Sequence, residues 1–177
     1  MNRQGLHRII RAAATMLGED TVVIIGSQSI LASFREFVLP DDATMSAEAD
    51  ILPFDDEDEA KADQLDGLLG EASHFYDKYG IYADGVSPWT ASLPSGWDER
   101  LVRIEDPESG ATGLCLHPED NVPRRAIYAK GPPTAAADIA RLTDKLARMR
   151  EASTRCGRTN RDGTLCRNDR RSCRDHR

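Results

Sequence analysis

The sequence lacks any long apolar run, any internal repeat and any compact apolar block near its beginning. Without an apolar run of about 20 residues, no membrane-spanning helix is predicted. Residues 1–20 place apolar side chains at helical spacing, and no cleavage site follows them, so they predict a helix rather than a secretory signal. We therefore expect one cytoplasmic globular domain of ordinary size with a small appendage.

Charge and cysteine are distributed unevenly along the chain. Residues 155–177 contain eight Arg and three Asp, a balance of +5, so residues 1–154 carry −12 of the total charge of −7. An acidic body followed by an Arg-rich tail predicts a segment that binds nucleic acid or an acidic partner, although a merely solvated tail has the same composition. The break in composition predicts a first domain over residues 1–152 and a tail over 153–177.

The pattern of elements predicts an α/β (α+β) fold. A β-branched run over residues 21–25 predicts a buried strand, and Gly26 ends it. Ser27 is expected to cap a helix over residues 28–38, and a second strand carries Glu48 and Asp50. The remaining expected elements are a helix over 56–69 that Gly70 closes, strands over 81–83, 101–105 and 113–116, a helix starting at Pro118 or Glu119, and a helix over 134–149.

Two carboxylates on the second predicted strand indicate a metal site. Because side chains alternate along a strand, Glu48 and Asp50 would point to the same face about 7 Å apart, close enough to share Mg²⁺. The turn at Gly26 and Ser27 would expose backbone N–H groups to a phosphate. Together these features predict a site for a nucleoside triphosphate with Mg²⁺. The alternative interpretation is a capping serine beside an exposed strand end.

Four segments, in this order, carry a resemblance to a known family: "VVIIGSQSIL", "SAEADILP", "GEASHFYDKYGIYADGVSPWTASLPSGWDERLV" and "LCLHPED". They resemble AbiEii-type nucleotidyltransferase-like proteins of bacterial toxin–antitoxin and abortive-infection systems. The resemblance covers roughly residues 5–130 and implies a small mixed sheet flanked by helices. It also implies that Gly26 and Ser27 contact the nucleotide and that Glu48 and Asp50 bind the metal.

The sequence departs from the family where activity is decided. Arg125 stands near the position of an expected lysine, and Pro132 and Pro133 replace a basic-acidic run. A third carboxylate is commonly needed in such a site. Glu105 is the candidate, with Asp98 and Asp106 as rivals and an exposed strand residue as the alternative interpretation of Glu105.

Two functions remain open at this point. The first is a transferase that binds a nucleoside triphosphate and moves a nucleotide to RNA or protein in a toxin–antitoxin or phage-defence setting. The second is a catalytically degenerate binding protein, or an antitoxin-like protein, with a nucleic-acid-binding tail. A cognate toxin or antitoxin protein is a further expected partner. The nucleotidyltransferase is the preferred interpretation, and the degenerate binding protein is the alternative.

The tail combines its arginines with a set of metal-binding side chains. Three thiols and an imidazole within one short polar segment match a tetrahedral Cys₃His zinc site, and metal binding would supply the folding free energy that burial cannot. Disulfides are the alternative, but three cysteines would leave one unpaired. The predicted zinc ligands are Cys156, Cys166, Cys173 and His176. Cys115, in contrast, is expected to be a buried apolar residue.

Overall fold

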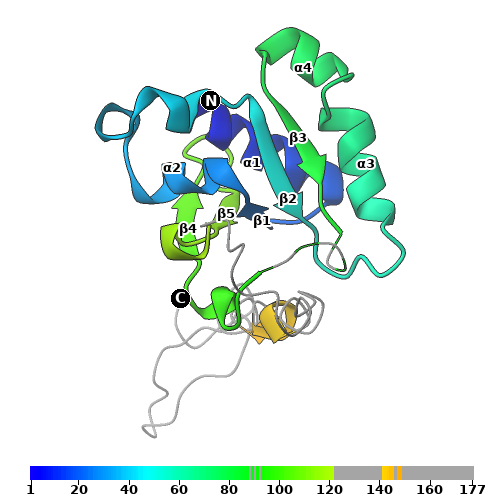
Figure 1. The fold of residues 1–177 in the computed structure, drawn as a ribbon. Helices are drawn as coiled ribbons and strands as arrows, with labels where there is room; N and C mark the ends of the chain where they lie inside the picture. The colour runs from blue at the N-terminus through cyan, green and yellow to red at the C-terminus, as the bar shows by residue number, and fades with distance from the viewer. Residues whose placement is uncertain (88, 90, 92, 122–140, 146, 149–177) are drawn as a thin grey trace, which may run out of the picture. The chain divides into compact units, whose positions relative to one another are not determined.

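The computed structural model describes residues 1–87, 89, 91, 93–121, 141–145 and 147–148 (Figure 1). Contacts divide the chain into two compact units, Met1–Ile139 and Ala140–Arg177. Residues 141–145 and 147–148 are helical, which agrees with part of the predicted helix. The predicted boundary at residue 153 lies outside the described residues. No helix in the described ranges is long and apolar enough to cross a membrane.

The first unit is built on a mixed five-stranded sheet with the order β3-β2-β1-β5-β4, which confirms the α+β class (Figure 1). β1 is antiparallel to β2 and parallel to β5, β2 is parallel to β3, and β4 and β5 form an antiparallel pair. The strands are β1 (Thr21–Ile25), β2 (Glu48–Leu52), β3 (Tyr82–Gly85), β4 (Val102–Glu105) and β5 (Thr112–Cys115).

The longer helices pack on one face of this sheet. α1 (Arg3–Leu17) carries the predicted apolar stripe and ends at Gly18, whose φ of 66° is left-handed. α3 (Ala60–Leu69) contacts α1 and runs along β3. The short helices are α2 (Ile30–Ser33) and α4 (His74–Tyr79), and the 3₁₀ turns are η1 (Ser27–Ser29), η2 (Glu36–Val38), η3 (Asp41–Thr44), η4 (Trp97–Glu99) and η5 (Pro118–Asp120).

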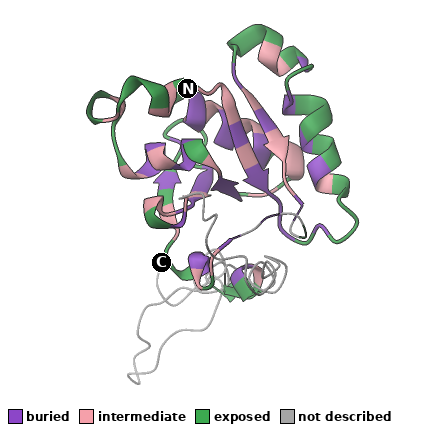
Figure 2. Cartoon of the chain, in the orientation of Figure 1, coloured by how far each residue is buried: buried purple, intermediate pink, exposed green. Residues whose placement is uncertain are grey.

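The core lies between the helices and the sheet, and Figure 2 shows buried residues concentrated there. Alternation along β1 sends Val22 and Ile24 into a cluster with α1 and α3. Val23 and Ile25 face the other side of the sheet and are buried as well, so all five residues of β1 are buried. Both faces of the central strand are therefore covered, as its continuous β-branched run predicted.

Two helix boundaries differ from the sequence predictions. Ser27 does not cap a helix: Gly26 holds the N-cap position without a side-chain bond, and the predicted helix over 28–38 is a 3₁₀ turn followed by α2, which ends at Ser33. The predicted helix from residue 56 begins instead at Ala60. Asp56 lies before it and accepts hydrogen bonds from the backbone N–H of Lys61 (2.7 Å) and Ala62 (2.9 Å).

Candidate functional site

Gly26 and the carboxylate of Asp50 meet where β1 ends. Asp50 pairs with Ile25 across the β1–β2 ladder, so its side chain lies beside the turn that follows β1. Gly26 has φ 70° and ψ −171°, a combination that only glycine adopts readily. A Cβ added at Gly26 would overlap Oδ2 of Asp50 and lie 3.0 Å from its Cγ. Glycine at this position is what permits the carboxylate to lie against the backbone of the turn.

Two further carboxylates, Glu48 and Asp84, lie near enough to Asp50 to act on its charge. Glu48 and Asp50 alternate with the buried Ala49 and Ile51, so they project from the sheet face opposite α1. The parallel register of β2 with β3 pairs Asp50 with Asp84. The sequence pattern correctly placed the Glu48–Asp50 pair on one face, and the sheet adds Asp84 to it.

The electrostatics of the cluster reflect its crowding. Burial, followed by repulsion from Glu48 and Asp84 and a hydrogen bond with Glu48, raises the pKa of Asp50 to about 6. Burial, followed by repulsion from Glu48, Asp66 and Glu71, also raises the pKa of Asp84. Asp50 and Asp84 are thus harder to ionise than ordinary aspartates. A cation placed among them would relieve this repulsion.

The donor set fits Mg²⁺ as a carboxylate pair. Glu48 and Asp50 supply the oxygen ligands that this ion prefers, and it commonly takes one or two carboxylates together with water and substrate phosphates. Within the described ranges, no group of three or more His, Cys, Asp or Glu side chains is arranged to hold a metal ion. The pair therefore suits an open site shared with a ligand rather than a closed protein cage.

The predicted third carboxylate, Glu105, does not lie in this cluster. It is on β4, and β1 and β5 separate that strand from β2. Its side chain is exposed, and its Oε2 lies 3.3 Å from Nη2 of Arg103. The alternative interpretation, an exposed strand residue, describes this position.

The rivals of Glu105 have other surroundings. Asp106 is fully buried and accepts hydrogen bonds from the backbone N–H (2.9 Å) and hydroxyl (2.6 Å) of Ser109, while Nε of Arg11 lies 3.0 Å away. Burial alone would raise the pKa of Asp106, but the hydrogen bonds from Ser109 and the charge of Arg11 hold this pKa below its ordinary value. Asp106 thus fastens the β4–β5 turn to α1, and Asp98 is buried within η4.

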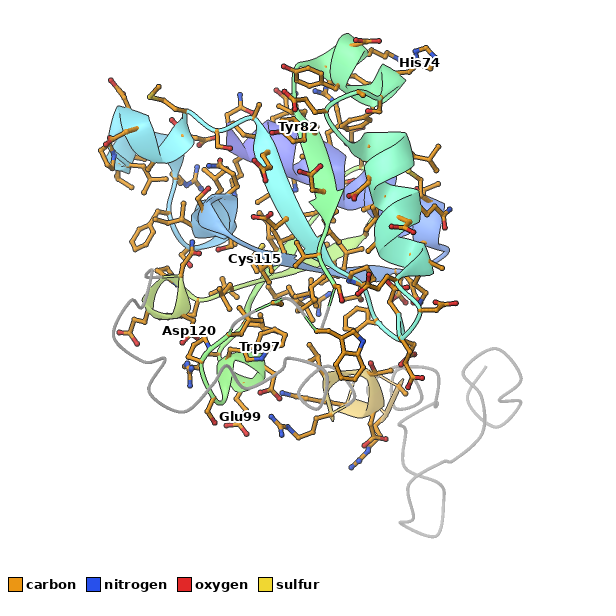
Figure 3. All side chains as sticks on the ribbon, turned by 45° about the vertical axis from the view of Figure 1, so that its right-hand side comes forward. His74, Tyr82, Trp97, Glu99, Cys115 and Asp120 are labelled. Atoms are coloured by element: carbon orange, nitrogen blue, oxygen red, sulfur yellow. The ribbon has the colours of Figure 1, made fainter. Side chains whose placement is uncertain are left out.

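Sequence reasoning missed Asp84 and Tyr82. The predicted strand over residues 81–83 stops one residue short of Asp84, and the strand observed is Tyr82–Gly85. The phenol of Tyr82, labelled in Figure 3, donates a hydrogen bond of 3.2 Å to Oε2 of Glu48. A signal for both residues was present in the sequence: Tyr82 and Asp84 are two residues apart, as Glu48 and Asp50 are, so each pair lies on one face of its strand.

The segment after β5 is joined to the turn after β1. The backbone N–H of Leu116 donates to the carbonyl of Ile24 (2.9 Å), which continues the β1–β5 ladder. Beyond it, the 3₁₀ turn η5 begins at Pro118, one of the two positions where a helix was predicted to start. The Asn121 amide donates a hydrogen bond to the Ser29 hydroxyl (3.3 Å). The "HPED" segment of the sequence is therefore attached to the same turn as Gly26.

Comparison with known proteins adds no relative to this description. No family model, no curated protein and no solved structure matched the chain. Arg125 and the four predicted zinc ligands lie outside the described residues.

Proposed function

We propose that this chain binds a nucleoside triphosphate with Mg²⁺ and acts as a nucleotidyltransferase of the AbiEii-like type, with RNA or protein as acceptor, in a toxin–antitoxin or phage-defence setting. The observation that carries the proposal is the fit between Gly26 and Asp50: a glycine-only backbone lies directly under a half-buried carboxylate. A strand end that merely faced solvent would not require this contact.

In this proposal the residues of the chain have separate roles. Glu48 and Asp50 hold the metal, which when bound offsets negative charge on the phosphates. The turn at Gly26 and Ser27 presents backbone N–H groups to the triphosphate. The acceptor hydroxyl attacks the α-phosphorus, pyrophosphate leaves with the bonding electron pair, and Asp84 takes the hydroxyl proton. Burial and the neighbouring charge of Glu48 raise the pKa of Asp84, which makes it a stronger base than an ordinary aspartate.

Removal of the Asp50 charge is expected to weaken triphosphate binding by about tenfold or more, because a carboxylate ligand of the metal is lost while its shape is kept. Calorimetric titration of the full chain with the α,β-methylene analogues of the four ribonucleoside triphosphates, each with Mg²⁺, measures this for Asp50→Asn. Glu105→Gln is the matched control, since it removes an exposed carboxylate on β4, and it should leave binding unchanged.

Two results of that titration would contradict the proposal. One is the absence of binding of all four analogues by the unmodified chain. The other is equal affinity in the unmodified chain and in Asp50→Asn. Radiolabelled transfer to total RNA or protein would then separate a transferase from a protein that only binds the nucleotide.

For the tail, the proposal is a zinc-binding segment over residues 153–177 that contacts nucleic acid through its arginines. The reduced full-length protein is expected to contain about one zinc ion per chain, and Cys166→Ser to lose it, because three ligands hold the ion less well than four. Elemental analysis after dialysis measures the content. Cys115→Ala is the control: this buried thiol should leave the zinc in place. Zinc-free reduced protein would exclude the segment as a metal site.

A further inference from the structure

The side chain of Glu48 is held by a phenol from the neighbouring strand. Tyr82 and Glu48 are register partners in the parallel β2–β3 ladder, and Oη of Tyr82 lies 3.2 Å from Oε2 of Glu48. We propose that Tyr82 is a positioning residue of the carboxylate pair: its phenol fixes one oxygen of Glu48 so that the other is oriented toward a divalent cation. This inference rests on the proposed function, because it assigns Glu48 to the metal.

The phenol is itself fixed in place. The backbone N–H of Tyr82 donates to the carbonyl of Ala47 (3.0 Å), which joins it to the start of β2. Its ring meets the ring of Tyr76 edge to face, with 5.4 Å between centroids and an interplanar angle of 84°. Tyr76 belongs to α4, which begins where the Ser73 hydroxyl accepts from the Tyr76 backbone N–H (3.2 Å). Backbone and ring contacts thus both restrict where the hydroxyl can lie.

The geometry of the contact makes the phenol the donor. Oη of Tyr82 lies 3.2 Å from Oε2 of Glu48, and the oxygens of an ionised carboxylate only accept hydrogen bonds. A protonated phenol beside a carboxylate donates a hydrogen bond and makes a poor nucleophile, so its role is to orient Glu48 rather than to accept a nucleotide.

Fixing one oxygen of a metal ligand increases its effectiveness. A free glutamate samples several rotamers and must be ordered when the ion binds. A partner bonded to the other oxygen selects the orientation in advance, and loss of such partners typically weakens metal binding. Tyr82 has this relation to Glu48, and its effect should disappear when Glu48 no longer serves as a charged ligand.

The test uses Mn²⁺ as a spectroscopic probe of the full chain, because it accepts the same oxygen ligands as Mg²⁺. Tyr82→Phe removes only the hydroxyl and is expected to weaken Mn²⁺ binding about three- to tenfold, as measured by the free-ion electron paramagnetic resonance signal. Tyr76→Phe is the matched control: it deletes a neighbouring phenol oxygen and leaves the Tyr82–Glu48 bond in place, so the affinity should not change. Circular dichroism melts check that both variants are folded.

A double-mutant cycle with Glu48→Gln shows whether Tyr82 acts through Glu48. In the Glu48→Gln background, Tyr82→Phe is expected to have less than about a twofold effect. Equal Mn²⁺ affinity in the unmodified chain and in Tyr82→Phe, or the same loss in both backgrounds, would overturn the inference while leaving the proposed function in place. If the unmodified chain binds no Mn²⁺, or if Asp50→Asn binds Mn²⁺ equally well, the proposed function and the inference are both wrong.

Discussion

Replacing Gly26 by alanine is expected to lower the free energy of unfolding by about 3–5 kcal/mol. The first cause is the backbone, whose φ of 70° and ψ of −171° are strained for any residue with a Cβ. The second is the carboxylate of Asp50, which occupies the space that the new methyl group needs. Urea unfolding followed by circular dichroism measures the change.

Gly18→Ala is the matched control for this substitution. Gly18 also has a positive φ, 66°, but a Cβ there would meet nothing within 4 Å. In Gly18→Ala the free energy of unfolding should fall only by what a left-handed backbone costs a residue with a Cβ, about 1–2 kcal/mol. The difference between the two glycine variants therefore measures mainly the overlap with Asp50.

A second background tests the same contact directly. In Asp50→Ala, the carboxylate that the Gly26→Ala methyl group would overlap is gone, so the cost of Gly26→Ala should shrink by about 1–2 kcal/mol. An unchanged cost would mean that the carboxylate does not lie against this turn in solution. The geometric basis of the proposed site would then be wrong.

Compared with the unmodified protein, Asp50→Asn is expected to become more stable as the pH rises. An unfolded aspartate ionises near pH 4, but in the folded protein the pKa of Asp50 is raised to about 6. Between these values the folded state holds a proton that the unfolded state has released, so the stability of the unmodified protein falls as the pH increases. The fall is nearly complete above about pH 7, one unit above the folded pKa, and asparagine does not undergo it.

The measured quantity is the stability of Asp50→Asn minus that of the unmodified protein. This difference should grow by about 1–2 kcal/mol between pH 4.5 and pH 7.5, a value reduced to allow for solvent screening of a half-buried group. Glu105→Gln, which changes an exposed carboxylate on β4, should give a nearly constant difference. A difference for Asp50→Asn that stays flat with pH would show that neither burial nor the neighbouring carboxylates raise the pKa of Asp50 in solution.

Local sequence patterns were enough to predict much of the fold. The β-branched run gave β1 with the bounds observed, and the apolar stripe with Gly18 gave α1. The alternation of Glu48 and Asp50 with apolar residues correctly put both carboxylates on one face of β2. These features depend on neighbours in the chain, which the sequence displays directly.

The composition of the cluster depends on contacts between distant segments and was not predictable in the same way. Asp84 joins Asp50 only because β2 and β3 pair in parallel with one particular register. Glu105 is excluded because the strand order places β4 at the other edge of the sheet. Both facts concern which strands meet, and no local pattern within either strand specifies its partner.

The strand order also has a consequence for synthesis on the ribosome. β1 gains one neighbour when β2 emerges, but its second neighbour, β5, is made far later, since Thr21 pairs with Thr112. Until then the nascent chain holds an apolar, β-branched strand with an open edge, and such edges promote aggregation. The turn at Gly26 is completed later still, when Asn121 reaches Ser29. A ribosome-bound fragment that ends before β5 would thus expose this edge of β1, and we expect it to aggregate more readily than the full chain.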